Sequence, residues 1–207
     1  MTYSWSFLAV AVVLILTPGA DFALIVRNTV TGGRAAGTAT TIGISTAAAI
    51  QGFLVATGLA SVITRAEPLF LAIKWVGVAY LVWLAITMIV SAIRGVYPPA
   101  TTTRQTYRGF RQGFLCNSTN PKILIFYLAL LPQFVDPQAP IATWLLHAWT
   151  LPVLGAAWCL GVVTFVDFFK RHLARRPVRR LLDAAAASAM LTALGGLLQT
   201  HIRQAPA

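Results

Sequence analysis

The sequence predicts an all-α integral membrane protein with six transmembrane helices, arranged as two inverted three-helix repeats. Three observations support this fold class. Hydrophobic residues make up 57% of the 207 residues and charged residues only 10%, which is too apolar for a soluble domain. The apolar residues fall into six runs, each long enough to cross a bilayer, which takes roughly 20 helical residues. The first and fourth runs are interrupted at Pro18 and Pro121.

The ends of the apolar runs set the boundaries of the spans. Turns that contain proline are expected at 65–68 and 136–140, because proline ends or begins helices, and longer basic loops are expected at 94–111 and 170–180. The predicted spans are residues 5–26, 38–63, 69–93, 112–135, 141–169 and 182–198. We expect a single transmembrane domain over 1–207, with repeat one at about 1–95, a cytoplasmic loop at 94–111 and repeat two at about 112–207.

The distribution of lysine and arginine predicts the orientation in the membrane. The connections after the first, third and fifth spans hold twelve of these residues, whereas the other side holds only Arg65 and Arg203. The positive-inside rule therefore places the basic loops in the cytoplasm and both termini outside. The basic cluster at 170–180 is expected to contact membrane lipid headgroups rather than nucleic acid. Because each repeat has an odd number of spans, the repeats run in opposite directions, as in many secondary transporters.

Polar interruptions at 17–21 and 117–122 break the first and fourth spans. Proline fits the first turn of a helix, so each break is expected to begin a new half-helix, with Thr17 and Asn120 as the N-caps. The free N–H groups of two such ends can hold a carboxylate near mid-membrane. Asp21 is the candidate for binding an ammonium group or for coupling to protons. The predicted substrate-binding residues are Asp21, Pro18, Gly19, Asn117, Asn120, Pro121, Lys122 and, in the second span, Gln51.

Several of these residues allow more than one interpretation. Asp21 and Lys122 offer opposite charges, which suits a zwitterion such as an amino acid, but they could instead form an internal salt bridge without a ligand. Gln51 could bind substrate or link two helices. His147 is expected to be a satisfied polar residue rather than a proton relay.

The residues do not suggest an enzyme or a metal site. Cys116 and Cys159 have no spacing typical of a metal site, and they are expected to be small packing residues. We therefore expect no metal, no cofactor and no catalytic residue.

A series of short motifs runs in order along almost the whole chain. They are Leu16-Thr17-Pro18-Gly19-Ala20-Asp21-Phe22, Arg27-Asn28, Gly32-Gly33-Arg34-Ala35-Ala36-Gly37, Gly43-Ile44, Lys74-Trp75-Val76-Gly77-Val78-Ala79-Tyr80-Leu81, Gly113-Phe114, Asn117, Asn120-Pro121-Lys122 and Leu131-Pro132-Gln133-Phe134. In their order and spacing, the chain resembles the LysE/RhtB family of bacterial amino-acid exporters. The resemblance implies efflux of amino acids or related metabolites across the inner membrane, coupled to the proton gradient, and association into homodimers. It also implies that Asp21 and the break at 120–122 are characteristic polar features.

The chain departs from the family pattern at two places. Ala20 stands where the family usually has a second proline. Ala48 and Gln51 stand where many relatives carry an acidic residue and a histidine. At these positions the chain is therefore expected to differ from its relatives in substrate range and in proton coupling.

The preferred function is a secondary exporter of amino acids or small zwitterionic metabolites that works by alternating access. A neutral amino acid is favoured, because Asp21 alone among the five acidic residues is placed deep in a span. A membrane thiol oxidoreductase is a second hypothesis, but the position that matches Cys116 in the other repeat is Val13. A membrane scaffold that transports nothing is a third.

Overall fold

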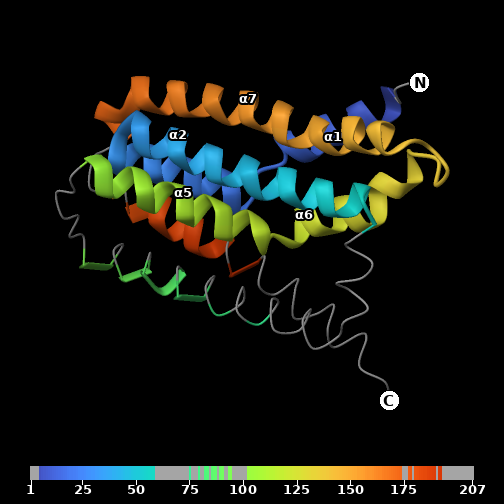
Figure 1. Ribbon diagram of the computed structural model, residues 1–207. Helices are drawn as coiled ribbons and strands as arrows, with labels where there is room; N and C mark the ends of the chain where they lie inside the picture. The colour runs from blue at the N-terminus through green and yellow to red at the C-terminus, as the bar shows by residue number, and fades with distance from the viewer. Residues whose placement is uncertain are drawn as a thin grey trace, which may run out of the picture.

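The computed structural model describes residues 5–58 and 102–173, isolated positions between 75 and 94, and most of 177–192. Every regular element in these ranges is helical, which confirms the all-α class; the six-span repeat stays a prediction (Figure 1). The elements are α1 (Trp5–Leu16), α2 (Ala20–Ala56), α5 (Thr102–Ser118), α6 (Pro121–Ile125), a π-helix (Phe126–Leu130), a 3-10 turn (Leu131–Gln133) and α7 (Ile141–Leu173).

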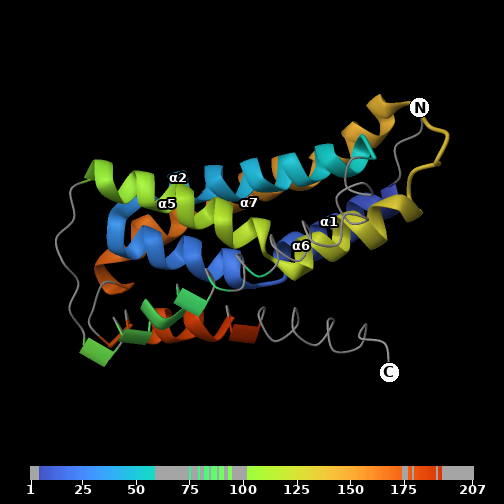
Figure 2. The same ribbon diagram turned by 60° about the horizontal axis from the view of Figure 1, so that its bottom comes forward.

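Helix α2 reverses direction at Gly33, so it consists of two antiparallel arms. Gly33 has φ 75° and ψ −174°, a conformation that residues with a side chain rarely adopt. Asn28 Nδ2 donates to Thr40 Oγ1 at 2.9 Å, although twelve residues of straight helix would separate them by about 18 Å. The arms are blue and cyan in Figure 2. The reversal lies between the predicted first and second spans, as expected.

Glycines bring the second arm of α2 against α5. A Cβ at Gly43 would collide with the carbonyl oxygen of Phe110, and a Cβ at Gly113 would collide with that of Thr40. Gly109 makes a similar approach, with the Ala36 oxygen 2.7 Å from where its Cβ would stand. Small residues at helical spacing therefore let the two backbones touch, as membrane helices commonly do.

The prediction of a loop at 94–111 is wrong for its second half, which is helical from Thr102 onward. Helix α5 begins at Thr102, ten residues before the predicted fourth span. The contact of Gly109 with α2 extends the helix pair past the end of the apolar run. Apolar runs mark the part of a helix that lipid can cover, whereas packing against a neighbour decides where the helix ends.

The prediction of a loop at 170–180 is also wrong at its start, because residues 170–173 are helical. Helix α7 continues to Leu173, and positions 177, 178 and 180 are also helical. Lysine and arginine are good helix formers, and their long side chains can reach the interface from within a helix. The charges end the apolar run without ending the helix.

By length and composition, two described helices could cross a membrane, namely Ala20–Ala56, whose length includes the reversal at Gly33, and Ile141–Phe169. A third candidate is the bent pair Gln105–Ser118 and Lys122–Gln133, whose halves meet at 51°. The predicted fifth span and the predicted break of the fourth span agree with these helices. Most of the predicted third span and part of the sixth lie outside the described residues.

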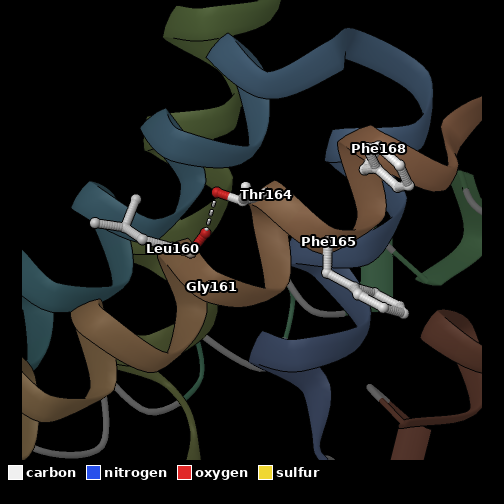
Figure 3. A pocket seen from close by; sticks show the side chains of 5 residues that line it. All are labelled: Leu160, Gly161, Thr164, Phe165 and Phe168. Atoms are coloured by element: carbon white, nitrogen blue, oxygen red, sulfur yellow. Dashed lines mark hydrogen bonds between the residues drawn. The ribbon is translucent and has the colours of Figure 1, made fainter.

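The outer face of α7 is apolar. Leu160, Gly161, Thr164, Phe165 and Phe168 line a shallow open hollow on it (Figure 3). The hydroxyl of Thr164 donates to the carbonyl oxygen of Leu160 at 2.9 Å, so it needs no partner from outside. Such a face suits contact with hydrocarbon rather than water.

A buried ion pair ties the first arm of α2 to the helical segment at 180–189, drawn in red in Figure 2. Arg27 Nε donates to Asp183 Oδ1 at 2.6 Å, and the Asp183 side chain is only 1% exposed. Arg27 Nη1 also donates to Asn28 Oδ1 at 3.4 Å, and Asn28 Nδ2 donates to Gln112 Oε1 at 3.0 Å. These bonds form one polar network across three helices. The sequence predicts Arg27 to lie in a basic connection after the first span, and no pattern in it points to a pair with Asp183.

The glycine contacts predict the effect of adding a methyl group. Gly113→Ala should lower the thermal stability of the purified protein in detergent, because overpacking costs roughly 1–3 kcal/mol. Gly161→Ala is the matched control, since no atom of another described segment lies within 4 Å of its Cβ position. Equal melting temperatures for the two variants would contradict the close contact between α2 and α5.

The ion pair predicts strong coupling between its two residues. Asp183→Ala alone should destabilise the protein by about 3 kcal/mol, because it leaves the Arg27 guanidinium, which is 16% exposed, without its ionic partner. Arg27→Ala combined with Asp183→Ala should cost less than the sum of the single changes. Melting temperatures of the four proteins in detergent check this, and additive losses would count against the pair.

Candidate functional site

The first break separates α1 from α2 at residues 17–19. Thr17 continues the turn of α1, since both its backbone N–H and its hydroxyl donate to the Val13 carbonyl oxygen, at 3.0 and 2.7 Å. Helix α2 begins at Ala20 with Gly19 as its N-cap and no side-chain cap. The prediction that Thr17 caps the second half-helix is therefore wrong. Its hydroxyl finds an acceptor in its own helix, and the new helix starts two residues later than expected.

The second break separates α5 from α6 and has the predicted form. Asn120 is the N-cap of α6, and its Oδ1 accepts from the backbone N–H of Lys122 at 3.1 Å. Pro121 takes the first helical position, where its missing N–H costs nothing. The sequence predicted this cap because all of its parts lie within three residues.

The two breaks meet at the carboxylate of Asp21. Its Oδ2 accepts from Asn117 Nδ2 at 2.9 Å and from Asn120 Nδ2 at 2.8 Å. Asp21 stands in the first turn of α2, where the positive end of the helix dipole favours a negative charge. The two asparagines are 99% and 96% buried. A charged group in an otherwise apolar region is thus held by two amides from a distant part of the chain.

Lys122, in the second break, forms hydrogen bonds to the first break. Its Nζ donates to the carbonyl oxygens of Leu14 at 3.1 Å and Thr17 at 2.9 Å. These carbonyls belong to the C-terminal end of α1, where a helix leaves acceptors unpaired and favours a positive charge. Both Asp21 and Lys122 are described, and no ion pair joins them. The internal salt bridge that the sequence left open is not formed in this conformation.

Gln51 links helices, which is one of the two roles considered for it. Its Nε2 donates at 3.3 Å to the backbone oxygen of Asn117, near the end of α5. The second arm of α2 is therefore joined to the same break that holds Asp21. His147 is a satisfied polar residue, as predicted, with its Nδ1 2.8 Å from the Thr143 carbonyl oxygen.

Three buried acceptors at this junction have no hydrogen-bond partner among the described residues. They are Asp21 Oδ1, Asn117 Oδ1 and Gln51 Oε1. The Cys116 thiol lies next to the Asp21 carboxylate, but a thiol is only a weak donor. An unpaired buried acceptor costs about 1–3 kcal/mol. The junction is therefore suited to receive a molecule that brings donors.

A small cavity of about 70 Å³ lies at the junction, between α1, α2, α6 and α7. Four of the predicted site residues line it, namely Gly19, Asp21, Asn117 and Lys122. Asn120 and Gln51 lie one contact further away, while Pro18 and Pro121 belong to the two breaks. The cavity is also lined by residues that the sequence does not assign to the site, among them Ser45, Ala48, Pro152, Gly155, Trp158 and Cys159.

Helical spacing is the one signal that could have pointed to the missed residues. Trp158 and Cys159 lie three and four positions after Gly155, which places all three on one face of α7. Ser45 and Ala48 likewise lie three positions apart on one face of α2. That spacing is equally typical of ordinary packing. Cys159 is a packing residue, as predicted, since it packs against the buried cluster of Ile25, Ile44 and Val163, and it also lines the cavity.

Known proteins resemble this chain over most of its length. The profile of the LysE type translocator family matches residues 12–201. The chain is 32% identical over 172 residues to the homoserine/homoserine lactone efflux protein of Salmonella typhimurium, covering 81% of this chain and 82% of that one, and the Salmonella typhi protein of that name gives the same values. YrhP of Bacillus subtilis, an uncharacterized membrane protein, is 28% identical over 178 residues, covering 81% and 85%. No solved structure matches the chain.

A match over residues 12–201 includes both breaks, the glycine contacts and the helix that carries Asp183. This chain is therefore a member of the LysE type translocator family, which makes it a membrane transporter rather than an enzyme.

Proposed function

We propose that this protein is a secondary exporter that moves amino acids or related small zwitterionic metabolites out of the bacterial cytoplasm. The observation that carries the proposal is the Asp21 carboxylate, held by amides of the opposite break beside a cavity. Relatives named for homoserine and homoserine lactone efflux support a small amino-acid-like substrate. Homoserine is therefore the first substrate to test.

The two charged ends of a zwitterion find different partners in the cavity. The substrate ammonium binds at Asp21, whose Oδ1 has no partner among the described residues. The substrate carboxylate binds at the first N–H groups of α2, which no side chain caps. Lys122 adds positive charge beside Gly19, since its Nζ is 3.7 Å from where a Cβ of Gly19 would stand.

Transport proceeds by alternating access between two inverted repeats within one domain of residues 1–207. The broken first and fourth spans supply the central site, as discontinuous helices do in other secondary transporters. Asp21 carries either a proton or the substrate ammonium, because one carboxylate oxygen cannot bind both at once. Proton entry therefore displaces substrate, which couples export to the proton gradient across the bacterial inner membrane. Association into homodimers is part of the same proposal, without a defined interface.

Replacing the carboxylate tests its role. Asp21→Asn should lower homoserine efflux from loaded cells by about tenfold or more, because a hydrogen bond to a charged group contributes roughly 1.5–3 kcal/mol. The amount of protein in the membrane should stay close to that of the wild type. Asp136→Asn is the matched control, since Asp136 lies in an exposed turn, where its carboxylate accepts from the Gln138 backbone N–H. Unchanged efflux in Asp21→Asn would remove Asp21 from the mechanism.

Cysteine labelling tests the proposed orientation. In a background without Cys116 and Cys159, a cysteine at position 104 should react only with reagent supplied from the cytoplasmic side. A cysteine at position 138 should react only from outside, because the basic loops are proposed to be cytoplasmic. Labelling of both positions from the same side would contradict the six-span arrangement.

A further inference from the structure

The second arm of α2 and the helix α7 lie side by side and touch at two levels (Figure 1). A Cβ at Gly52 would stand 3.1 Å from the Ala148 side chain. A Cβ at Gly37 would stand 3.1 Å from the side chain of Val163. The two levels are equally far apart along each helix, from 52 to 37 in α2 and from 148 to 163 in α7. The helices are therefore antiparallel and keep one register between these contacts.

Gly155 and Ser45 stand opposite each other between the two levels. Ser45 is as far from Gly52 in α2 as Gly155 is from Ala148 in α7. Both Gly155 and Ser45 line the cavity. A Cβ at Gly155 would nevertheless meet no atom of another described segment within 4 Å. The two helices thus touch on both sides of this level and leave open space at it.

The backbone of α7 does not require a glycine at position 155. The residue lies inside a helix, and its φ is not positive. Glycine is a poorer helix former than alanine, and protein interiors are ordinarily packed without open space of this kind. The missing side chain therefore contributes room to the cavity rather than stability to the fold.

The charged and the small or apolar residues of the cavity come from different helices. Asp21, Asn117 and Lys122 belong to the two breaks, where the proposed function places both charged ends of the substrate. The residues that α7 contributes carry no charge, and they are Leu151, Pro152, Gly155, Trp158 and Cys159. The side chain of an amino acid held at the breaks therefore extends toward α7.

We propose that Gly155 is a specificity-determining residue, which leaves room between α7 and Ser45 for the side chain of the transported amino acid. This inference rests on the proposed export function and adds to it a limit on the size of the substrate side chain. A methyl group at position 155 would occupy space that the substrate needs. One methylene group more or less in such a pocket changes discrimination by about tenfold or more.

A series of side-chain lengths tests this role on the full-length protein in liposomes. Proteoliposomes are loaded with labelled homoserine or with one of the straight-chain amino acids from alanine to norleucine, and the rate of efflux is measured. In Gly155→Ala the ratio of the homoserine rate to the alanine rate should fall about tenfold. An equal loss for homoserine and alanine would overturn the role of Gly155 and leave the export function intact. A wild-type protein that exports no member of the series would overturn both.

Two further variants separate a loss of space from a loss of structure. Gly161→Ala is the matched control, because Gly161 lies in the same helix but lines the outer hollow, with equal room at its Cβ position. It should leave the ratio unchanged. Ser45→Thr adds a methyl group from the opposite wall and should lower the ratio as Gly155→Ala does. Gly155→Ala should also melt no lower than the wild type, since alanine favours the helix.

The comparison of these variants decides between the two explanations. A ratio that falls as far in Gly161→Ala as in Gly155→Ala would overturn the inference, because the hollow on the outer face is no part of the cavity. A ratio that stays unchanged in both Gly155→Ala and Ser45→Thr would overturn it as well.

Discussion

The hydrogen bonds between Asp21 and the amides of Asn117 and Asn120 are the interaction on which the rest of the structure depends. A carboxylate in an apolar span is costly unless other polar groups compensate it. Here the compensation comes from the other broken span, about a hundred residues away in the sequence. The contact between the two breaks therefore helps to set where α1, α2, α5 and α6 meet.

Lys122 completes this mutual support in the reverse direction. Asp21 beside the first break accepts from the amides of the second break. The Lys122 ammonium group of the second break donates to the carbonyl oxygens at the end of α1. The glycines between α2 and α5 hold the two breaks at contact distance. Because Asp21 and Lys122 each have other partners, neither charge neutralises the other directly. A zwitterion can therefore approach both without first breaking an ion pair.

Local chemistry explains which features the sequence could predict. The Asn120 cap and Pro121 lie within one helical turn, so their arrangement was predicted correctly, as was the meeting of the two breaks. The same rule for a residue before proline predicts an N-cap at Thr17, but the hydroxyl of Thr17 donates to the carbonyl oxygen of Val13. The partners of Lys122 and Arg27 depend on how distant helices pack, and no spacing in the sequence encodes them. The helical residues 102–111 were missed because hydropathy follows lipid contact rather than helix length.

The central claim is that Asp21 receives the substrate ammonium group. Solid-state NMR on the protein in lipid can measure the distance between the nitrogen of ¹⁵N-homoserine and the ¹³C-labelled carboxyl carbons of aspartate, with Asp21→Asn identifying the Asp21 signal. The account predicts a nitrogen to carbon distance of about 3–4 Å at Asp21, as a direct hydrogen bond requires. Bound homoserine that shows no coupling to the Asp21 carboxyl carbon would contradict it.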